Sequence, residues 1–298
     1  MLVVLLVIFI IAMFLSIWVR MIVCHPISCL CYACSDVFLY FKQHRYDWFE
    51  GGHLDCYEAP FGGGKTITMV HDGLSLYRRY NNKRVFDRRR GIWVIQKVLL
   101  LSNVEIKDCE GYQYMSGLKQ FVECAKYNEV LDLKYNTRTC VIGCLDEASV
   151  QLNSRNFKSN IDYGFLSVLL TCRHFAIDLY TTSQKFHLQD ALLRSVTQRV
   201  IHCEKVWRLV TKEFYNADDV EKTGSLTLLN PLAITGYICS NKDYGAYDTY
   251  AVVENLDRDT QNGDMMTAEE VLAARGNFYT DTDAIERPSR KLKRMRKR

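Results

Sequence analysis

The chain has 298 residues, of which 48% are hydrophobic and 24% are charged. This composition is typical of a globular protein and excludes wholesale disorder and collagen-like repeats, while a mean hydropathy of -0.12 excludes a polytopic transporter but allows one membrane segment. The net charge of +4 hides an asymmetry, because residues 287–298 carry eight Lys or Arg and no acid. The rest of the chain is therefore mildly acidic, and the basic character belongs to a C-terminal tail.

The N-terminal part begins with an uncharged, mostly apolar run over residues 2–19. About 20 apolar residues are needed to span the hydrocarbon core of a bilayer. A cleaved signal peptide would need a charged start and a cleavage site made of small residues. The run has neither, since no basic side chain precedes it and it ends in Trp18 and Arg20. We therefore predict a membrane anchor over residues 1–24.

The basic residues around this run predict its orientation. None precedes the run, whereas Arg20, Lys42 and Arg45 follow it. Because cytoplasmic flanks carry an excess of Lys and Arg, the N-terminus is expected outside and everything after residue 24 in the cytoplasm. We predict a single-pass membrane protein without a periplasmic domain.

Four cysteines gather at the end of the predicted span and in a connector expected over residues 25–50; they are Cys24, Cys29, Cys31 and Cys34. A structural zinc site usually takes two separated pairs of ligands, which this spacing does not offer. Palmitoylation of juxtamembrane cysteines is an alternative, but the apolar neighbours favour simple filler at the interface. Cytoplasmic placement predicts that the remaining cysteines are reduced thiols.

From residue 51 onward, strand-like runs alternate with helical patterns. Strands are expected at residues 53–58, 92–95, 98–102, 139–145, 177–182 and 199–203, and helices at about 65–80, 116–130, 160–174 and 187–196. This alternation is typical of an α/β domain with a mostly parallel sheet that is covered on both faces. We predict such a domain over residues 51–215, with residues 205–215 as a late strand.

A C-terminal extension is predicted over residues 216–286. Within it, residues 225–254 are expected to form further strands and residues 267–275 a helix, because Thr267 precedes acidic residues in a first turn.

Two basic segments are candidate contacts for anions. Residues 78–90 hold seven Lys or Arg and one Asp, and they are expected to form a loop that either contacts DNA or is solvated. The tail at residues 287–298 has three interpretations: it binds DNA phosphates without reading sequence, it lies against anionic lipid, or it remains solvated.

The segment that carries the clearest chemistry is APFGGGKT, from Ala59 to Thr66. It matches the phosphate-loop pattern, with Ala59 in place of the first glycine, and it lies between a predicted strand and a predicted helix, as that pattern requires. Lys65 is expected to reach the β- and γ-phosphates of ATP, and Thr66 to bind Mg²⁺. The glycines let backbone N–H groups turn toward phosphate oxygens at the positive end of the helix. These glycines are Gly62, Gly63 and Gly64.

A second motif is the hydrophobic strand at 139–145, which ends in Asp146 and Glu147. In phosphate-loop enzymes an acid at this place helps to hold Mg²⁺, and we expect that role for Asp146. A following acid can act as general base on the attacking water, and we expect that role for Glu147. A solvated acidic turn is the plainer interpretation of this motif alone, but the phosphate loop upstream favours an ATPase.

Further candidates lie downstream. Gln184 follows the strand predicted at 177–182, where its amide can hydrogen-bond the γ-phosphate or the water. Oligomeric ATPases also need a cation donated to a neighbour's γ-phosphate, and Arg suits this role through its fixed charge and planar fork. Arg155, Arg173 and Arg194 are the candidates, although each of them can equally be a surface or salt-bridge residue.

Taken in order, these motifs resemble the FtsK/HerA superfamily of DNA-pumping ATPases, and within it the Zot-like (zonula occludens toxin-like) assembly ATPases of filamentous phages. The resemblance covers about residues 53–204. It is carried by the phosphate loop, the strand VLLLSN ending at Asn103, CLDEA at 144–148, Arg155, LSVLLTCRHFAIDLYTTSQ at 166–184, and Leu193-Arg194.

The resemblance implies a RecA-like P-loop NTPase fold, preceded here by one N-terminal transmembrane helix. It implies the same roles for the phosphate loop and the acidic pair, a sensor role for Gln184, and action of Arg173 or Arg194 on the neighbouring subunit. Typical Zot-like proteins place the ATPase before the membrane span. This chain has the reverse order, as in FtsK and conjugative coupling proteins.

The implied function is ATP-driven assembly and extrusion of a filamentous phage, or DNA export, by a homo-oligomer that is expected to be a hexameric ring. The ring would act at the host inner membrane, with DNA or phage coat proteins as partners. Two alternatives stay open: a DNA translocase for conjugation or genome packaging, and a non-catalytic membrane scaffold that binds nucleotide. Intact Glu147 and Gln184 argue against the scaffold, and a small-molecule kinase would have no use for the arginines or the anchor.

Overall fold

A computed structural model of the chain describes residues 16–107, 109–115, 118–148 and 171–247. It divides into two compact units, Met1–Trp48 and Phe49–Arg298. In the first unit, helices α2 (Ile17–Cys24) and α3 (Pro26–Lys42) are followed by a short 3-10 turn, η1 (Arg45–Asp47). The two helices meet at 96°, where Pro26, which lacks a backbone N–H, opens the second helix.

The membrane anchor predicted over residues 1–24 falls largely on residues 1–15, which lie outside the described residues. Within the described part, no single helix is long and apolar enough to cross a bilayer. The bent pair of α2 and α3 meets the requirements of length and composition only when the two helices are taken together.

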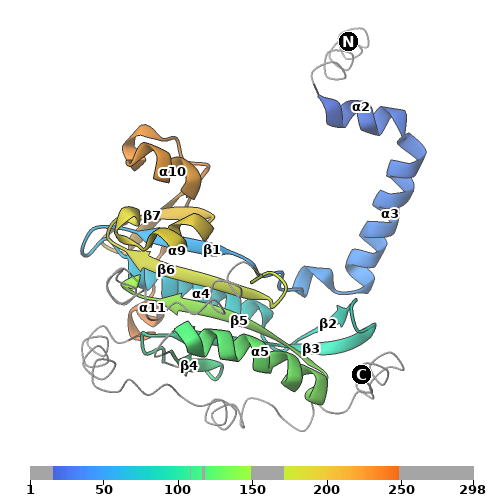
Figure 1. Cartoon of the computed structure of the whole chain (residues 1–298), viewed down its shortest axis with the longest axis horizontal. Coiled ribbons are helices and arrows are strands. Elements are labelled where there is room, and N and C mark those ends of the chain that lie inside the picture. The colour runs from blue at the N-terminus through green and yellow to red at the C-terminus, as the bar shows by residue number, and fades with distance from the viewer. Residues whose placement is uncertain (1–15, 108, 116–117, 149–170, 248–298) are drawn as a thin grey trace. The chain divides into compact units, whose positions relative to one another are not determined.

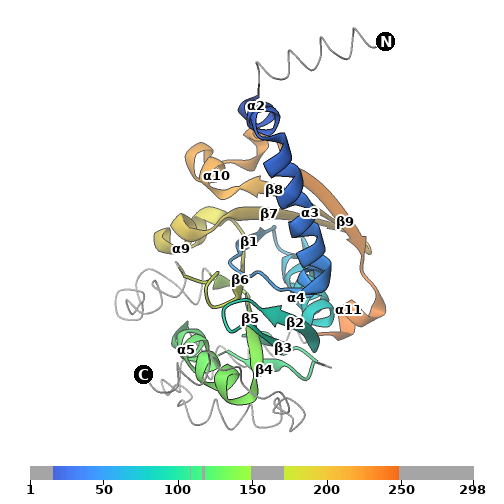
Figure 2. The ribbon, with the colours of Figure 1, turned by 90° about the vertical axis from the view of Figure 1, so that its right-hand side faces the viewer.

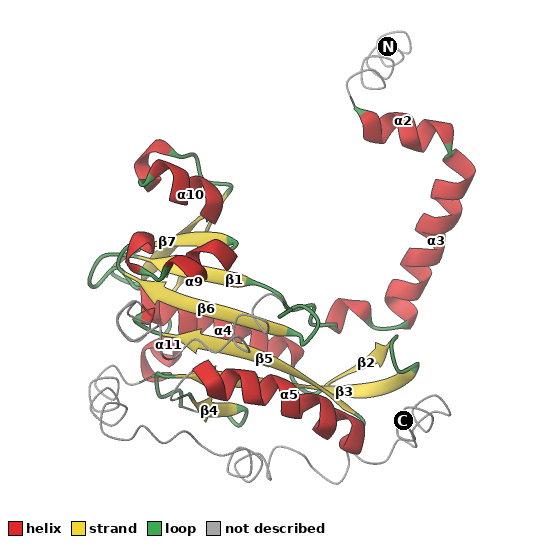
Figure 3. Ribbon diagram, viewed as in Figure 1, coloured by secondary structure: helices red, strands yellow, loops and turns green. Residues whose placement is uncertain are grey.

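The second unit is built on one sheet of nine described strands (Figures 1 and 3). Eight of them follow the order β2-β3-β5-β6-β1-β7-β8-β9, and β4 pairs with β3. Their bounds are β1 Leu54–Glu58, β2 Lys83–Asp87, β3 Ile92–Ser102, β4 Tyr112–Tyr114, β5 Thr137–Leu145, β6 Ile177–Ser183, β7 Arg199–Val206, β8 Leu209–Asn216 and β9 Ala233–Ile238.

The centre of the sheet is parallel and its two edges are antiparallel. Strands β3, β5, β6, β1 and β7 run in the same direction, whereas β2 and β8 run against it. Strand β9 is antiparallel to β8 and so returns to the direction of the central strands. Strand β6 lies between β1 and β5, so the carboxyl ends of these three strands meet at one edge of the sheet. This mostly parallel sheet confirms the α/β part of the predicted fold class.

Helices cover the two faces of the parallel strands (Figure 2). Helix α4 (Lys65–Tyr80) packs on one face and α5 (Leu118–Tyr135) on the other. Because side chains alternate along a strand, Val98 and Leu100 of β3 join the core around α4, while Leu99 and Leu101 join the core around α5. Each such burial contributes about 1.5–3 kcal/mol.

The basic segment at residues 78–90 is not the loop that the sequence predicts. Its residues Lys83–Asp87 form the edge strand β2, which pairs antiparallel with β3. Asn82 turns the chain into this strand with a φ of 58°, and Val85 and Asp87 are its buried positions. The many basic residues hid this alternation in the sequence. Their charge suits an edge strand, because charged side chains discourage the strand from pairing with another chain.

The strand predicted over residues 205–215 is confirmed for the most part as β8, but the chain reverses near its start, because residues 205–206 still belong to β7. Val206 at the end of β7 pairs with Leu209 at the start of β8, and Trp207 in the turn has a φ of 56°. The alternation of apolar and polar residues continues through this turn, so the pattern alone does not reveal the reversal. Upstream, the two runs predicted at 92–95 and 98–102 are the one continuous strand β3.

Other elements depart from expectation in extent or type. The helix predicted at 187–196 is a 3-10 turn, η2 (Phe186–Leu188), followed by α9 (Ala191–Val196), because the Asp190 side chain caps α9 through the Leu192 N–H at 2.8 Å. The predicted helix at 116–130 corresponds to α5 and ends later.

The C-terminal extension predicted at 216–286 contributes to the same sheet. Its described part holds α10 (Ala217–Thr223), η3 (Leu226–Leu228), β9 and α11 (Asn241–Gly245), so residues 225–254 are not strands throughout. The helix predicted at 267–275, the basic tail and most of the helix predicted at 160–174 lie outside the described residues.

Candidate nucleotide-binding site

The phosphate loop connects β1 to α4 at the carboxyl edge of the sheet. Gly62 and Gly64 have φ values of 76° and 88°, a region that glycine enters without steric cost. A side chain on Gly63 would place its Cβ 2.8 Å from the Cβ of Ala59, so only glycine fits there. Gly64 is the N-cap of α4, and the first N–H groups of a helix have no partner within it. The loop is therefore shaped to receive an anion.

Lys65 and Glu147 form an ion pair at this edge. The Lys65 ammonium lies 2.9 Å from the Glu147 carboxylate, and 5.5 Å from the centre of the exposed Phe61 ring. Lys65 itself is 8% exposed. Both charged groups therefore lie within reach of a phosphate that enters the loop.

Asp146 lies at the end of β5 and is held by hydroxyl groups from two other elements. Thr66 of α4 donates to its Oδ1 at 2.8 Å and Thr182 of β6 donates to the same oxygen at 2.6 Å. Burial raises the pKa of this carboxyl, against the two hydrogen bonds, which lower it. Carboxylate and hydroxyl oxygens are the ligands that Mg²⁺ prefers.

The backbone around the acidic pair is also fixed by side chains. Asn103, which follows β3 and is 2% exposed, donates to the Asp146 carbonyl at 2.9 Å and accepts from its N–H at 2.7 Å. Thr182 accepts the Glu147 N–H at 2.8 Å. Glu147 has a φ of 49°, a left-handed conformation that costs about 1–3 kcal/mol outside glycine. The hydrogen bonds of Asn103 and Thr182 therefore hold the strained backbone conformation of Glu147.

Gln184 lies at the same edge. It directly follows Ser183, which is aligned with Glu58 at the end of β1, and its side chain is half-buried. Its backbone is thus beside the start of the phosphate loop, where the predicted contact to phosphate or water can form.

The arginine candidates are placed differently. Arg173 is exposed and precedes β6, so the whole strand separates it from the phosphate-loop edge, about 20 Å at about 3.3 Å per residue. Arg194 in α9 contacts Glu221 at 2.9 Å and the Gln189 carbonyl at 2.6 Å. Arg155 lies outside the described residues. The structure therefore brings neither Arg173 nor a free Arg194 to the phosphate loop of its own chain.

Sequence reasoning gave no role to two of the residues that organise the site. Thr182 was visible only as one of several small hydroxyl residues at a strand end, and Asn103 only as the end of a hydrophobic run. Their significance comes from the order of strands, which brings the ends of β3 and β6 to either side of β5.

The residues present fit ATP and Mg²⁺. The backbone N–H groups of the glycine loop and the Lys65 ammonium can bind phosphate oxygens. Thr66 and Asp146 offer oxygen atoms as ligands for the metal. No three His, Cys, Asp or Glu side chains of the described residues gather into an all-protein metal site.

No model of a known protein family matches the sequence, and no curated protein matches it. Among solved structures, the chain is similar to the N-terminal domain of zonular occludens toxin from Neisseria meningitidis, with 19% identity over 66% of this chain and 98% of that one, and a TM-score of 0.43. The solved structures that it resembles thus include a toxin of the Zot type, as the motifs indicated, and the likeness is one of fold.

Two further structures have the same kind of similarity. ATPases 2 and 3 of EssC from Geobacillus thermodenitrificans match with 14% identity over 72% of this chain and 44% of that one, at a TM-score of 0.38. The genome packaging NTPase B204 from Sulfolobus turreted icosahedral virus 2, solved with ATP-gammaS, matches with 10% identity over 63% and 92%, at a TM-score of 0.38. These scores are low, so the functional argument rests on the geometry of this chain.

Proposed function

We propose that this protein is a P-loop ATPase motor, anchored in the host inner membrane with its N-terminus outside and its ATPase domain in the cytoplasm. The observation that carries this proposal is the convergence of Lys65, Asp146 and Glu147 at the carboxyl edge of the sheet, with Lys65 and Glu147 in contact at 2.9 Å. A phosphate-binding lysine and two acids with distinct surroundings are the groups that ATP hydrolysis needs.

Each group has a separate task in hydrolysis. Lys65 stabilises charge that develops on the β- and γ-phosphate oxygens. Glu147 orients the attacking water and accepts its proton. Asp146 and Thr66 would hold Mg²⁺, which would supply charge neutralisation at the phosphates. Thr182 and Asn103 position Asp146 and Glu147 through hydrogen bonds to these two residues.

The proposal includes a homo-oligomeric ring, for which six subunits are expected. Arg173 lies at the opposite edge of the sheet from the phosphate loop of its own chain. An arginine in that position reaches a γ-phosphate only when it is donated to a neighbouring subunit. Gln184, next to the phosphate loop, would sense the state of the γ-phosphate in its own chain.

The proposed output is virion assembly and extrusion of a filamentous phage, or DNA export through the envelope, with DNA or coat proteins as the cargo. A DNA translocase for conjugation or packaging is the first alternative, favoured by the basic tail at residues 287–298. A nucleotide-binding scaffold is the second alternative, and the retained Glu147 counts against it.

The deciding experiment is ATP hydrolysis by the detergent-solubilised full chain, with and without single-stranded or double-stranded DNA. Variants Lys65→Ala and Glu147→Gln serve as controls, and both should slow turnover by about 100-fold or more. Strong stimulation by DNA would favour a translocase, whereas turnover indifferent to DNA would favour an assembly motor that acts on coat protein. Nucleotide binding without turnover in oligomeric protein would leave only the scaffold.

A further inference from the structure

A second basic group lies beside the phosphate loop, on the β7–β8 hairpin. The stem of Lys205 packs against Gly64, since a Cβ added to that glycine would lie 3.0 Å from the Lys205 Cβ and 3.3 Å from its Cδ. The Lys205 ammonium lies 4.6 Å from the centre of the Tyr244 ring, and the Arg208 guanidinium lies 5.5 Å from the same centre. Two cations therefore share one aromatic ring next to the loop.

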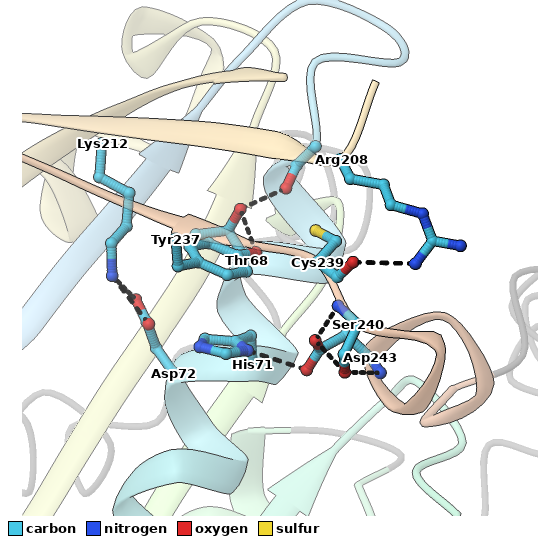
Figure 4. A network of polar contacts seen from close by, with 10 residues as sticks. Thr68, His71, Asp72, Arg208, Lys212, Tyr237, Cys239, Ser240 and Asp243 are labelled. Atoms are coloured by element: carbon cyan, nitrogen blue, oxygen red, sulfur yellow. Dashed lines mark hydrogen bonds and ion pairs between the residues drawn. The ribbon is translucent and has the colours of Figure 1, made fainter. Parts of the chain in front are cut away.

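The C-terminal extension holds this group in place, and Figure 4 shows one of the contacts, from Arg208 to the Cys239 carbonyl. Arg208 donates to the Cys239 carbonyl at 3.1 Å and to Asn241 at 2.7 Å, while the Tyr244 hydroxyl donates to the Trp207 carbonyl at 3.3 Å. These contacts join the hairpin to α11, which carries Tyr244.

Helix α11 also contacts α4, the helix that follows the phosphate loop, through polar side chains. His71 of α4 lies 2.9 Å from Asp243 and stacks on Tyr237 with ring centres 4.0 Å apart. Asp243 also forms a capping box with Ser240. The group made by Lys205, Arg208 and Tyr244 is therefore attached on both sides and preorganised, a property that reduces the cost of binding a ligand.

The electrostatics of this place favour an anion. The N-terminus of α4 is the positive end of a helix dipole, and Lys65 already lies there, paired with Glu147. Among the described residues, no carboxylate forms a salt bridge with Lys205 or Arg208. Positive groups gathered at the positive end of a helix repel one another, and an anion between them removes that cost.

The order of the strands indicates which part of a nucleotide this anion belongs to. Glu147 follows β5, on the β6 side of β1, and marks the end of the site where the water attacks the γ-phosphate. Lys205 lies on β7, on the other side of β1. A nucleotide whose γ-phosphate points toward Glu147 extends its remaining part toward β7.

We propose that Lys205, supported by Arg208 and Tyr244, forms a subsite that binds the α-phosphate of the nucleotide. This inference rests on the proposed nucleotide binding at Lys65 and goes beyond it, because it assigns the β7–β8 hairpin and α11 to the nucleotide site. Lys205 contacts a group that ATP and ADP share, whereas Lys65 contacts the β-phosphate and also the γ-phosphate, which only ATP has.

The test is the dissociation constant of the detergent-solubilised full chain for ATP and for ADP, each with Mg²⁺. Lys205→Met keeps the aliphatic stem against Gly64 and removes the charge. A hydrogen bond to a charged group corresponds to about a tenfold change in affinity or more, so this variant should bind both nucleotides about tenfold more weakly, by the same factor. Lys65→Met should weaken ATP more than ADP. Lys222→Met, on the exposed surface of α10, is the matched control and should change neither.

Three results would overturn the subsite: equal affinities for the Lys205→Met and Lys222→Met variants, a loss confined to ATP, or a loss of labelled-oligonucleotide binding with nucleotide affinity intact. The last result would assign the anion to the DNA backbone. Lys205→Arg retains the charge and should retain affinity, and unchanged melting of Lys205→Met without nucleotide shows that it is folded. Wild-type protein that binds neither nucleotide would instead refute the proposed function.

Discussion

Lys65 and Glu147, which serve the phosphate and the water respectively, contact each other directly through Nζ and Oε1 at 2.9 Å. Neither group can perform its task while this ion pair persists. Nucleotide entry has to draw Lys65 toward phosphate, and the same movement releases Glu147 toward the water. The pair therefore couples occupancy of the loop to readiness of the general base.

This coupling predicts opposite effects of Glu147→Gln on binding and on turnover. Loss of the competing carboxylate should tighten ATP binding by roughly fivefold, the equivalent of about 1 kcal/mol for a partly exposed ion pair. Loss of the base should slow hydrolysis by about 100- to 10,000-fold. Equilibrium binding and single-turnover assays on the same preparation measure both, and unchanged ATP affinity would show that the pair does not compete with phosphate.

Two neighbouring threonines on β6 provide a matched comparison. Thr182→Val removes the hydroxyl that donates to Asp146 and accepts from the Glu147 N–H, so the Mg²⁺ concentration for half-maximal hydrolysis should rise by about tenfold. Thr181 points to Asp55 and Gln189 instead, and Thr181→Val should leave the Mg²⁺ requirement unchanged. Equal shifts in a Mg²⁺ titration of the two variants would contradict the assignment.

The buried carboxylate of Asp146 predicts a dependence of stability on pH. Burial raises its pKa above the ordinary value of 3.8, so the folded state holds the proton more tightly than the unfolded state. The contribution of this group to stability is therefore present below pH 3.8 and is lost as pH rises through the raised value.

Asp146→Asn tests this sign. The amide oxygen can still accept from Thr66 and Thr182, and the variant carries no buried charge. At neutral pH without nucleotide it should melt at a higher temperature than the wild type, and the difference should shrink toward pH 4. Thermal unfolding at several pH values measures it, and a variant less stable than the wild type at pH 7 would contradict the prediction. The same variant should lose Mg²⁺-dependent hydrolysis.

A mixing experiment tests whether Arg173 acts on a neighbouring subunit. Lys65→Ala and Arg173→Ala should each be inactive alone. Mixed oligomers place an intact phosphate loop from one variant beside an intact Arg173 from the other, and they should recover part of the turnover. The same mixture made with Arg194→Ala tests the other candidate. Failure of both mixtures, with mixing verified by differently tagged subunits, would exclude these arginines as donors in trans.

The phosphate loop and the parts of the sheet next to it are predictable from the sequence because their signals are local. The apolar runs of β3 and β5, and a glycine loop ahead of α4, are each contained within a few consecutive residues. The edge strand β2 escaped prediction because its charges hide a short alternation, and the Trp207 turn escaped because the pattern of β7 continues into β8.

The supporting contacts of the site could not be read in the same way. Asn103 lies 43 residues from Asp146, and Thr182 lies 36 residues from it. Lys205 and Gly64 come from separate strand and loop elements that only the sheet order brings together. Such contacts depend on the tertiary arrangement, for which a single sequence carries no local pattern.

The cysteines of this chain differ in accessibility, so that a thiol-reactive probe can distinguish one part of the chain from another. Cys56, Cys140, Cys144 and Cys203 are buried in the sheet core, and burial raises the pKa of Cys140 and Cys203 to about 12. Thiols of this kind do not react at neutral pH, because the thiolate is the reactive form. Cys24, Cys31 and Cys34 are exposed on α2 and α3. A maleimide probe added to native protein should therefore label α2 and α3 first, and its fluorescence would report whether lipid or water surrounds these helices.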